Sequence, residues 1–334
     1  MSGVNSLGNV LVTGSAGHLG EGLCWTLMNA GVTVTGLDIK KSRHTTLVGS
    51  VFDPAIVNEA MADVDTVFHT ATLHKPHVKT HTQQDFIDTN ISGTQTLLDA
   101  AVAKGVKRFI FTSTTSVFGH AMRPQQAGPA VWVSEELVPD PKNIYGVTKL
   151  AAESLCRLVQ RESGLPVIVL RTSRFFPEDD DLAKVRSQFG SDNSKANEFL
   201  YRRAELEDII SAHFCAASRA EQLGYGLYIV SASPPFSQSD LSRLATDARQ
   251  VVQSYYPDYA EIYSALGWEM FKTLDRVYDN SKALKDLGWQ PKTSFRAVLD
   301  EARSRQQLLR SDVTHYVGVK GYHEQVFRDG PYPV

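Results

Sequence analysis

Short apolar runs alternate with amphipathic segments along the first half of the 334-residue chain. Runs of this kind predict strands, and the amphipathic segments between them predict helices. The predicted strands cover residues 9–14, 32–38, 45–51, 65–70, 107–114 and 166–173, and the predicted helices cover 18–30, 54–61, 86–104 and 143–163. Regular alternation with right-handed crossovers predicts an α/β fold with a doubly wound parallel sheet of the Rossmann type.

The pattern changes after Arg174. Residues 175–199 are polar and irregular, and a helix over 205–224 and a strand over 225–233 then return to the sheet. Further helices are expected near 238–254, 280–287 and 295–309. We therefore predict a Rossmann core over residues 1–174 and a smaller, mixed α/β substrate region over 175–334, with about 204–254 returning to the core.

Composition narrows the function classes. Hydrophobic residues make up 42% of the chain, which is enough for a hydrophobic core. The formal net charge is −3, so the composition does not indicate a nucleic-acid-binding surface. No apolar run approaches the ~20 residues of a membrane span, and the N-terminal residues lack a signal-peptide pattern. Cys24, Cys156 and Cys215 form no CxxC pair, which favours free thiols and a cytoplasmic location.

A glycine pattern follows the first predicted strand. Gly14, Gly17 and Gly20 in "TGSAGHLG" allow a tight turn, close approach of a pyrophosphate, and close packing of the next helix. The helix N-terminus then offers free N–H groups to phosphates. A structural turn is the alternative, but the strand before and the helix after it favour dinucleotide binding.

Asp38 ends the second predicted strand, at the distance where a carboxylate can accept both ribose hydroxyls. A carboxylate at this place repels the additional phosphate of NADP, so NAD is the expected cofactor. Lys40, Lys41 and Arg43 follow and weaken this preference. The alternative is that Asp38 is an ordinary turn residue.

Tyr145 and Lys149 lie four residues apart, which places them on one face of the predicted helix 143–163. On its own, the pair could be a surface decoration. The polar run 112–116 ends the preceding strand, where the ligand crevice of this topology lies. An ammonium and an oxidised nicotinamide nearby would lower the pKa of the phenol from its usual ~10, so that it could accept the proton of a substrate alcohol.

Taken together, these motifs resemble the extended short-chain dehydrogenase/reductase superfamily, and within it the NAD-dependent sugar epimerases and dehydratases. The resemblance reaches to about Glu301. It rests on "TGSAGHLG", Asp38, "VFHTAT", "DTNISGTQTLLDAA", "FTSTTSVFG", "YGVTK", "VIVLRTSR" and "LGWQPKTSF".

The resemblance implies residue roles. Thr114, Tyr145 and Lys149 would be catalytic, with Tyr145 the general acid/base and Lys149 the residue that holds the nicotinamide ribose and lowers the Tyr145 pKa. The implied cofactor residues are Gly14, Ala16, Gly17, His18, Leu19, Gly20, Asp38, Ser50, Val51, Thr70, Ala71, Thr72, His74, Asn90, Thr112, Tyr145, Lys149, Arg171 and Ser173. A homodimer through helices 86–104 and 143–163 is also implied.

Departures from the family pattern bear on the substrate. Ser50 stands where an Asp is expected, and "RTSRFFPEDDD" places Arg174 and Phe175 where the sugar-nucleotide epimerases tend to have an Asn and a Gly-Pro-like turn. Clear counterparts of their diphosphate-binding arginines are missing, because Arg202, Arg203 and Arg276 could equally be solvated surface residues. The candidate substrate residues are His74, Thr114, Thr115, Arg174 and Phe175. A free sugar, sugar acid or polyol-like substrate becomes credible beside a nucleotide sugar.

Two further clusters were weighed for metal binding. His74, His77 and His81 lack a carboxylate or Cys partner in the sequence and fall in a predicted loop, which favours phosphate or substrate contact by His74 over a metal site. The acidic run 178–181 is expected to be a solvated loop. We therefore expect no metal.

Three outcomes share the predicted machinery. An epimerase returns the hydride and retains NAD, whereas a dehydrogenase of a free sugar, sugar acid or polyol releases NADH. A dehydratase ranks lower, because Thr115 and Ser116 stand where the compared dehydratases carry an Asp-Glu pair. A non-catalytic NAD-binding regulatory protein is the remote alternative, and the presence of Thr114, Tyr145 and Lys149 argues against it.

Overall fold

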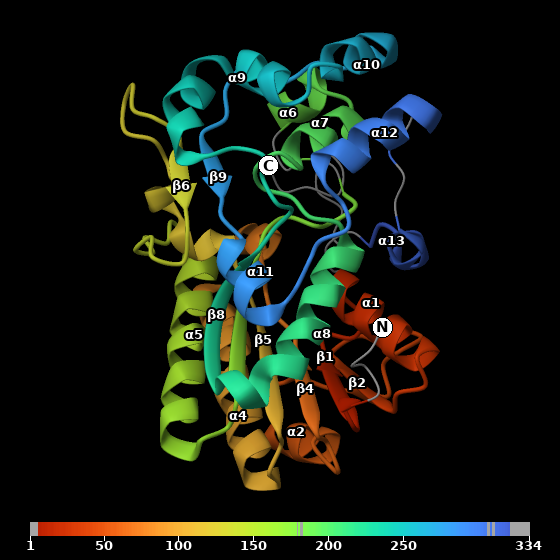
Figure 1. The fold of residues 1–334 in the computed structure, drawn as a ribbon. Helices are drawn as coiled ribbons and strands as arrows, with labels where there is room; N and C mark the ends of the chain where they lie inside the picture. Colours follow the sequence, from red (N-terminus) through yellow and green to blue (C-terminus); the bar gives the residue numbers. More distant parts are fainter. Residues whose placement is uncertain (1–5, 179, 181–182, 306–307, 309–310, 321–334) are drawn as a thin grey trace.

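The computed structural model describes residues 6–178, 180, 183–305, 308 and 311–320. Its centre is a parallel sheet of seven strands in the order β3-β2-β1-β4-β5-β7-β8 (Figure 1). The strands are β1 (Val10–Thr13), β2 (Val34–Asp38), β3 (Leu47–Val48), β4 (Thr66–His69), β5 (Arg108–Thr114), β7 (Val167–Thr172) and β8 (Tyr225–Val230). The predicted Rossmann-type α/β fold is confirmed, although β3 is only two residues long.

Helices cover both faces of this sheet. One face carries α1 (His18–Asn29), α8 (Leu206–Leu223), α11 (Ser281–Leu287) and α13 (Asp312–Val317), and the other carries α2 (Pro54–Ala60), α4 (Gly93–Lys104) and α5 (Ile144–Ser163). Neighbouring residues of β1 divide between the two cores, since Val10 and Val12 face α1 and α8 while Leu11 faces α2 and α4. Burial on both faces explains why the strands appear as continuous apolar runs.

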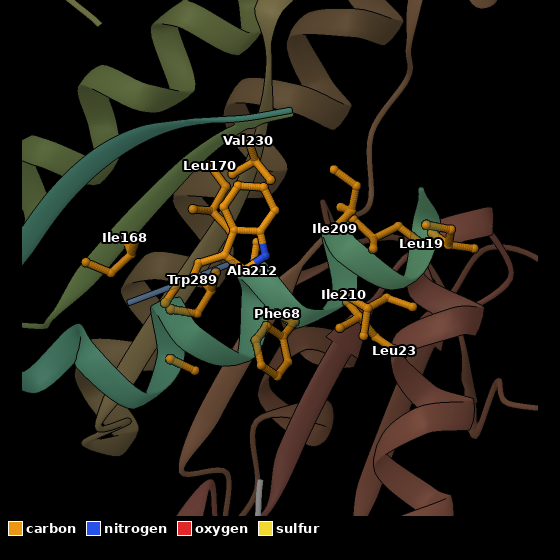
Figure 2. Close-up of a cluster of buried hydrophobic side chains, with 14 of the residues drawn as sticks. Leu19, Leu23, Phe68, Ile168, Leu170, Ile209, Ile210, Ala212, Val230 and Trp289 are labelled. Carbon is orange, nitrogen blue, oxygen red and sulfur yellow. The ribbon is translucent and has the colours of Figure 1, made fainter. Parts of the chain in front are cut away.

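Trp289 lies at the centre of the α8 side of the core. Figure 2 shows its ring beside Leu170 and Val230, with Phe68 of β4 and with Ile209 and Ile210 of α8 farther from the ring. Its indole N–H donates to the Asp208 carbonyl at 3.1 Å and to the Ser211 hydroxyl at 2.9 Å. These bonds tie the chain after α11 to α8.

The predicted helix 86–104 is three consecutive elements: α3 (Gln83–Ile87), a π-helical turn (Asp88–Ser92) and α4. A π turn widens the helix by one residue, and such turns often lie at functional sites. Here the widened turn contains Asn90, whose side chain is buried. The amphipathic pattern that predicted the helix 86–104 did not indicate the additional residue of the π-helical turn.

A second region lies above the carboxyl ends of the strands (Figure 1). It contains α6 (Ala183–Gln188), α7 (Ser191–Glu198), α9 (Leu241–Tyr255), α10 (Tyr259–Leu266), α12 (Phe295–Arg305) and a two-stranded parallel sheet of β6 (Val131–Val133) and β9 (Arg276–Tyr278). Segment 204–254 is divided, since α8 and β8 join the Rossmann layers and α9 packs with α10 and α12. The domain division at Arg174 stays a prediction.

Two expectations for segment 175–199 were wrong. It is not irregular throughout, because α6 and α7 lie within it. Glu178 and Asp180 are also not solvated: they are 2% and 5% exposed and pair with His18 and with Arg174, respectively. The other two residues of the acidic run, 179 and 181, lie outside the described residues. Burial beside cations, which sequence reasoning could not see, explains the difference.

Candidate functional site

One continuous cavity of about 910 Å³ opens at the carboxyl ends of the parallel strands, below the second region. Most of the predicted site residues line it. They are Gly14, Ala16, Gly17, His18, Leu19, Gly20, Asp38, Ser50, Val51, Thr70, Ala71, Thr72, His74, Thr112, Thr114, Thr115, Tyr145, Ser173, Arg174 and Phe175. Asn90, Lys149 and Arg171 lie outside the lining.

The glycine loop forms a cradle at one end of the cavity. Gly14 has φ +72°, and a Cβ there would lie 2.7 Å from the Ala71 nitrogen. A Cβ on Gly20 would lie 1.9 Å from the Gly14 carbonyl oxygen, so the third glycine is required for close packing of α1. The loop backbone therefore packs closely against the start of α1 at the cavity, a geometry that fits the pyrophosphate of a dinucleotide.

Asp38 ends β2 at the same end of the cavity. Its carboxylate accepts the backbone N–H of Ala16 at 2.9 Å and that of Lys40 at 2.8 Å. These bonds fix the carboxylate between the glycine loop and the turn after β2. Ser50 and Val51 line the cavity nearby, so this end has the groups that an adenosine ribose and its base would meet.

Tyr145 reaches the cavity from the first turn of α5 and is 8% exposed. Burial raises the pKa of the phenol to about 12, and a hydrogen bond with the Thr114 side chain opposes the rise. Thr114 ends β5, and its hydroxyl accepts the Ser116 N–H at 3.1 Å. The fold thus brings the predicted Thr114 and Tyr145 together.

Lys149 lies one turn below Tyr145, 2% exposed. Its ammonium sits 3.9 Å from the centroid of the Phe111 ring, beneath the cavity lining. Burial lowers the pKa of the amine to about 7, and the neighbouring Cys156 and Glu153 oppose this lowering. In the protein alone, burial outweighs the Thr114 hydrogen bond, and Lys149 is not among the groups that lower the Tyr145 pKa. The lowering predicted for the complex with oxidised nicotinamide stays a prediction.

Asn90 supports the cavity from behind. Its side-chain oxygen accepts the Thr72 hydroxyl and the Leu73 N–H, both at 2.9 Å, and its amide donates to the Leu73 carbonyl at 2.9 Å and the Thr148 hydroxyl at 3.0 Å. One side chain thus ties the loop after β4 to α5. Its position matches a supporting role for the loop, without direct contact to the cavity.

Arg171 does not line the cavity, contrary to its predicted place among the cofactor residues. It is 4% exposed and its guanidinium donates to the Glu153 carboxylate at 3.0 and 2.7 Å. Ser113 donates to the same carboxylate at 2.5 Å. Arg171 lies within β7 and points toward Glu153 of α5, whereas Ser173 follows the end of the strand and reaches the cavity.

The structure reveals a basic lining that sequence analysis missed. Nine Lys or Arg residues line the cavity, against three Asp residues and no Glu. Beyond the glycine loop and Asp38 these are Lys75, Arg123, Lys142, Arg174, Arg202 and Arg276, whereas Lys320 lines the end at the glycine loop. They come from segments far apart in the chain, so no local spacing could have identified them.

Among the described residues, two of these guanidinium groups keep one unused donor each. Arg174 and Arg202 share Asp180 and Glu198, and Arg276 pairs with Asp275 at 2.7 Å. The Nε atoms of Arg202 and Arg276 are buried and make no hydrogen bond within the described part of the chain. Arg202 is not the solvated surface residue that the sequence allowed, and neither is Arg203, which is 4% exposed.

His74 lines the cavity and stacks on Phe176, with ring centroids 5.7 Å apart. His77 lies behind it and accepts the His74 N–H at 2.9 Å. Among the described residues, no group of three His, Cys, Asp or Glu side chains is placed to hold a metal ion. No described helix has the length and apolar character to cross a membrane.

Comparison with known proteins decides the family. Residues 10–198 match the model of the NAD dependent epimerase/dehydratase family. The chain belongs to this family. The match spans the glycine loop, Asp38, Thr114 and Tyr145, and it ends before β9 and α13. NAD is accordingly the cofactor class, and the glycine cradle and Asp38 are the groups that would hold it.

Its relatives cover several chemistries. The chain is 30% identical over 185 residues to a low-salt glycan biosynthesis protein of Haloferax volcanii, covering 50% of this chain and 57% of that protein. It is 25% identical over 332 aligned positions to a 3-beta-hydroxysteroid dehydrogenase of Mycolicibacterium neoaurum, covering 85% and 87%. The chain thus spans less than two thirds of the Haloferax protein.

Solved structures agree on the fold. A short-chain dehydrogenase/reductase superfamily protein of Agrobacterium tumefaciens with bound NAD has a TM-score of 0.62 at 24% identity, covering 89% of this chain and 96% of that one. A UDP-glucose 4-epimerase of Thermotoga maritima with UDP-glucose has a TM-score of 0.62 at 20% identity, covering 90% and 100%. At these identities the likeness shows the shared fold alone.

Proposed function

We propose that this enzyme transfers hydride at a carbinol carbon of a sugar or sugar derivative that carries an anionic group, with Tyr145 as general acid/base. When bound, the nicotinamide ring accepts the hydride and can return it. The Tyr145 phenolate accepts the proton of the substrate hydroxyl, and the resulting phenol returns the proton when the hydride is returned. Thr114 holds the same oxygen, because its hydroxyl already lies within hydrogen-bonding reach of the phenol.

Burial sets a requirement on this chemistry. A phenol with a pKa near 12 is almost entirely protonated at neutral pH, so proton abstraction needs a positive charge close by. Lys149 is the nearest candidate on the same helix, and the oxidised ring would add a second charge. We infer that Lys149 acts on Tyr145 in the loaded enzyme, where the charges are brought together.

The excess of basic over acidic side chains in the lining is the observation that carries the substrate proposal. Lys75, Arg123 and Arg276 lie close enough to Lys142 that, after burial, their charges lower its pKa. Placing like charges around a cavity is unfavourable unless an anion joins them. A phosphate, diphosphate or carboxylate on the substrate would relieve this repulsion and accept the orphaned Nε donors of Arg202 and Arg276.

A steroid substrate, suggested by the Mycolicibacterium relative, fits this cavity poorly. An apolar ring system would strip water from Lys142, Arg202 and Arg276 without supplying an acceptor, which is costly. Phe175, Phe176 and Met122 supply apolar contact, but they share the wall with these cations.

Binding and turnover measurements test the proposal separately. Purified enzyme with NAD is titrated with nucleotide sugars, sugar acids and the corresponding neutral sugars, and product and NADH are followed. We expect anionic sugars to bind at least tenfold more tightly than their neutral counterparts, with this preference reduced in Arg276→Met. Equal affinity for neutral and anionic sugars would refute the substrate class.

Tyr145→Phe tests the chemistry. We expect turnover to fall more than ~100-fold while NAD affinity stays within threefold of the parent, because the ring is kept and only the hydroxyl is removed. Unchanged turnover would refute the role of Tyr145. Epimerised product without NADH accumulation supports an epimerase, our preferred outcome, whereas stoichiometric NADH identifies a dehydrogenase.

A further inference from the structure

The segment 311–320 folds back onto the phosphate end of the cofactor cleft, although it lies beyond the part of the chain that matches the family model. Its last described residue, Lys320, lines the cavity together with Gly17 and His18 of the glycine loop. No motif of the sequence pointed to this residue. What it does depends on how firmly the segment is held and which charges it meets.

Two anchors fix the segment. At its start, the Ser311 N–H and hydroxyl donate to the Glu205 carboxylate at 3.2 and 2.9 Å, just before α8. At its middle, the Tyr316 ring stacks on Trp25 of α1 with centroids 5.1 Å apart, and its hydroxyl bonds His44 at 2.9 Å. Lys320 is therefore delivered to α1 by a docked helix, α13.

Lys320 then makes two contacts at the glycine loop. Its backbone N–H donates to the Glu178 carboxylate at 3.1 Å, and that carboxylate also bonds His18 at 2.6 Å. Its ammonium pairs with Glu21 in the first turn of α1. The side chain of Glu21 is 2% exposed and has Arg43 as a further partner at 2.7 Å.

The negative charge of Glu21 opposes phosphate binding at the N-terminus of α1. A helix N-terminus attracts a pyrophosphate through its dipole and free N–H groups, but a buried carboxylate one turn away repels it. Arg43 is 54% exposed and hence partly screened by water. Lys320, at 21% exposure, is the more buried of the two cations and the one that lines the cavity.

We propose that Lys320 is an NAD-affinity residue: held over the glycine loop by segment 311–320, it cancels the charge of Glu21 and closes the phosphate end of the cleft. It acts on the cofactor through the charge of Glu21 and takes no part in proton transfer. This role is independent of the substrate, so it can be tested without turnover.

The test measures NAD binding by isothermal titration calorimetry on the full-length protein. We expect Lys320→Met to raise the Kd for NAD about five- to tenfold and Lys320→Arg to leave it within twofold. ADP-ribose, which carries the pyrophosphate without nicotinamide, should show the same loss. The loss should shrink in 0.5 M salt, because it is electrostatic. Lys107→Met removes a lysine paired with Asp65 at 2.8 Å, away from the cavity lining, and is the matched control.

A double variant separates charge from structure. Glu21→Gln/Lys320→Met has the same local net charge as the parent, so its Kd should recover to within threefold. If Lys320→Met binds NAD within twofold of the parent, the proposal is overturned. It is equally overturned if the double variant binds as weakly as the single one, since undocking of the segment would then explain the loss.

Discussion

Replacing Arg171 with Met should destabilise the protein strongly and leave the cofactor site intact. Glu153 is 4% exposed and accepts both guanidinium bonds of Arg171 together with the Ser113 hydroxyl. Removing the cation leaves a buried carboxylate with a single donor. Losing one partner of a buried pair costs about 3–5 kcal/mol, because the remaining charge is uncompensated.

The expected fall in melting temperature follows from this loss of unfolding free energy and the length of the chain. An unfolding entropy of ~2.1 cal/mol/K per residue over 334 residues gives about 0.7 kcal/mol/K. The melting temperature should therefore fall by about 4–7 °C in differential scanning calorimetry. Arg157→Met removes an exposed guanidinium from α5, the helix that carries Glu153. It should change stability by less than about 1 kcal/mol, because it loses only an exposed contact 5.1 Å from the centroid of the Tyr225 ring.

Two further measurements make the reasoning refutable. Arg171→Met/Glu153→Leu should recover at least half of the lost stability, because the carboxylate that lost its partner is removed as well. NAD affinity, measured below the melting transition, should stay within threefold of the parent since Arg171 does not line the cavity. An unchanged melting temperature with a loss of NAD binding would restore Arg171 to the cofactor site and contradict this account.

Three other predictions follow from the same geometry. Burial lowers the pKa of Lys149 to about 7, so between pH 7 and ~10 the unfolded chain binds a proton that the folded chain lacks. The free energy of unfolding of the parent, relative to that of Lys149→Met, should therefore rise with pH by up to about 1.4 kcal/mol per pH unit. Parallel curves of unfolding free energy against pH for the two proteins, measured with urea, would contradict this expectation. Gly20→Ala places a Cβ 1.9 Å from the Gly14 carbonyl oxygen and should abolish measurable NAD binding in calorimetry, whereas Gly190→Ala, with no heavy atom within 4 Å of its Cβ, should behave as the parent. We also propose a homodimer through α4 and α5, because Val147 and Leu158 on α5 are 48% and 47% exposed. The double variant Val147→Asp/Leu158→Asp should elute as a monomer in size-exclusion chromatography with light scattering, whereas Val138→Asp should stay dimeric. A monomeric parent protein would refute the proposal.

Local chemistry was enough to predict the dinucleotide half of this protein. Gly14 and Gly20 are required by backbone geometry that no other residue meets at the same distances, so their spacing identifies the phosphate cradle in the sequence itself. Strands buried on both faces leave long apolar runs, which made β1, β5 and β7 visible. Tyr145 lies four residues from Lys149 on one helix, a relation that the helical period fixes.

The tertiary structure alone decided the basic half of the cavity and the outer wall of the cofactor cleft. Arg202, Arg276 and Lys142 meet only because β9, α7 and the approach to α5 converge over the strand ends, and a charge becomes informative only once its neighbours and burial are known. The same holds for Lys320, whose place beside Glu21 depends on helix docking far from both residues in the chain. Sequence spacing determines contacts within a turn or a strand. Contacts between distant segments depend on how the hydrophobic faces of helices and sheets pack. For this reason the sequence did not show that Arg171 points toward α5 and not into the cavity.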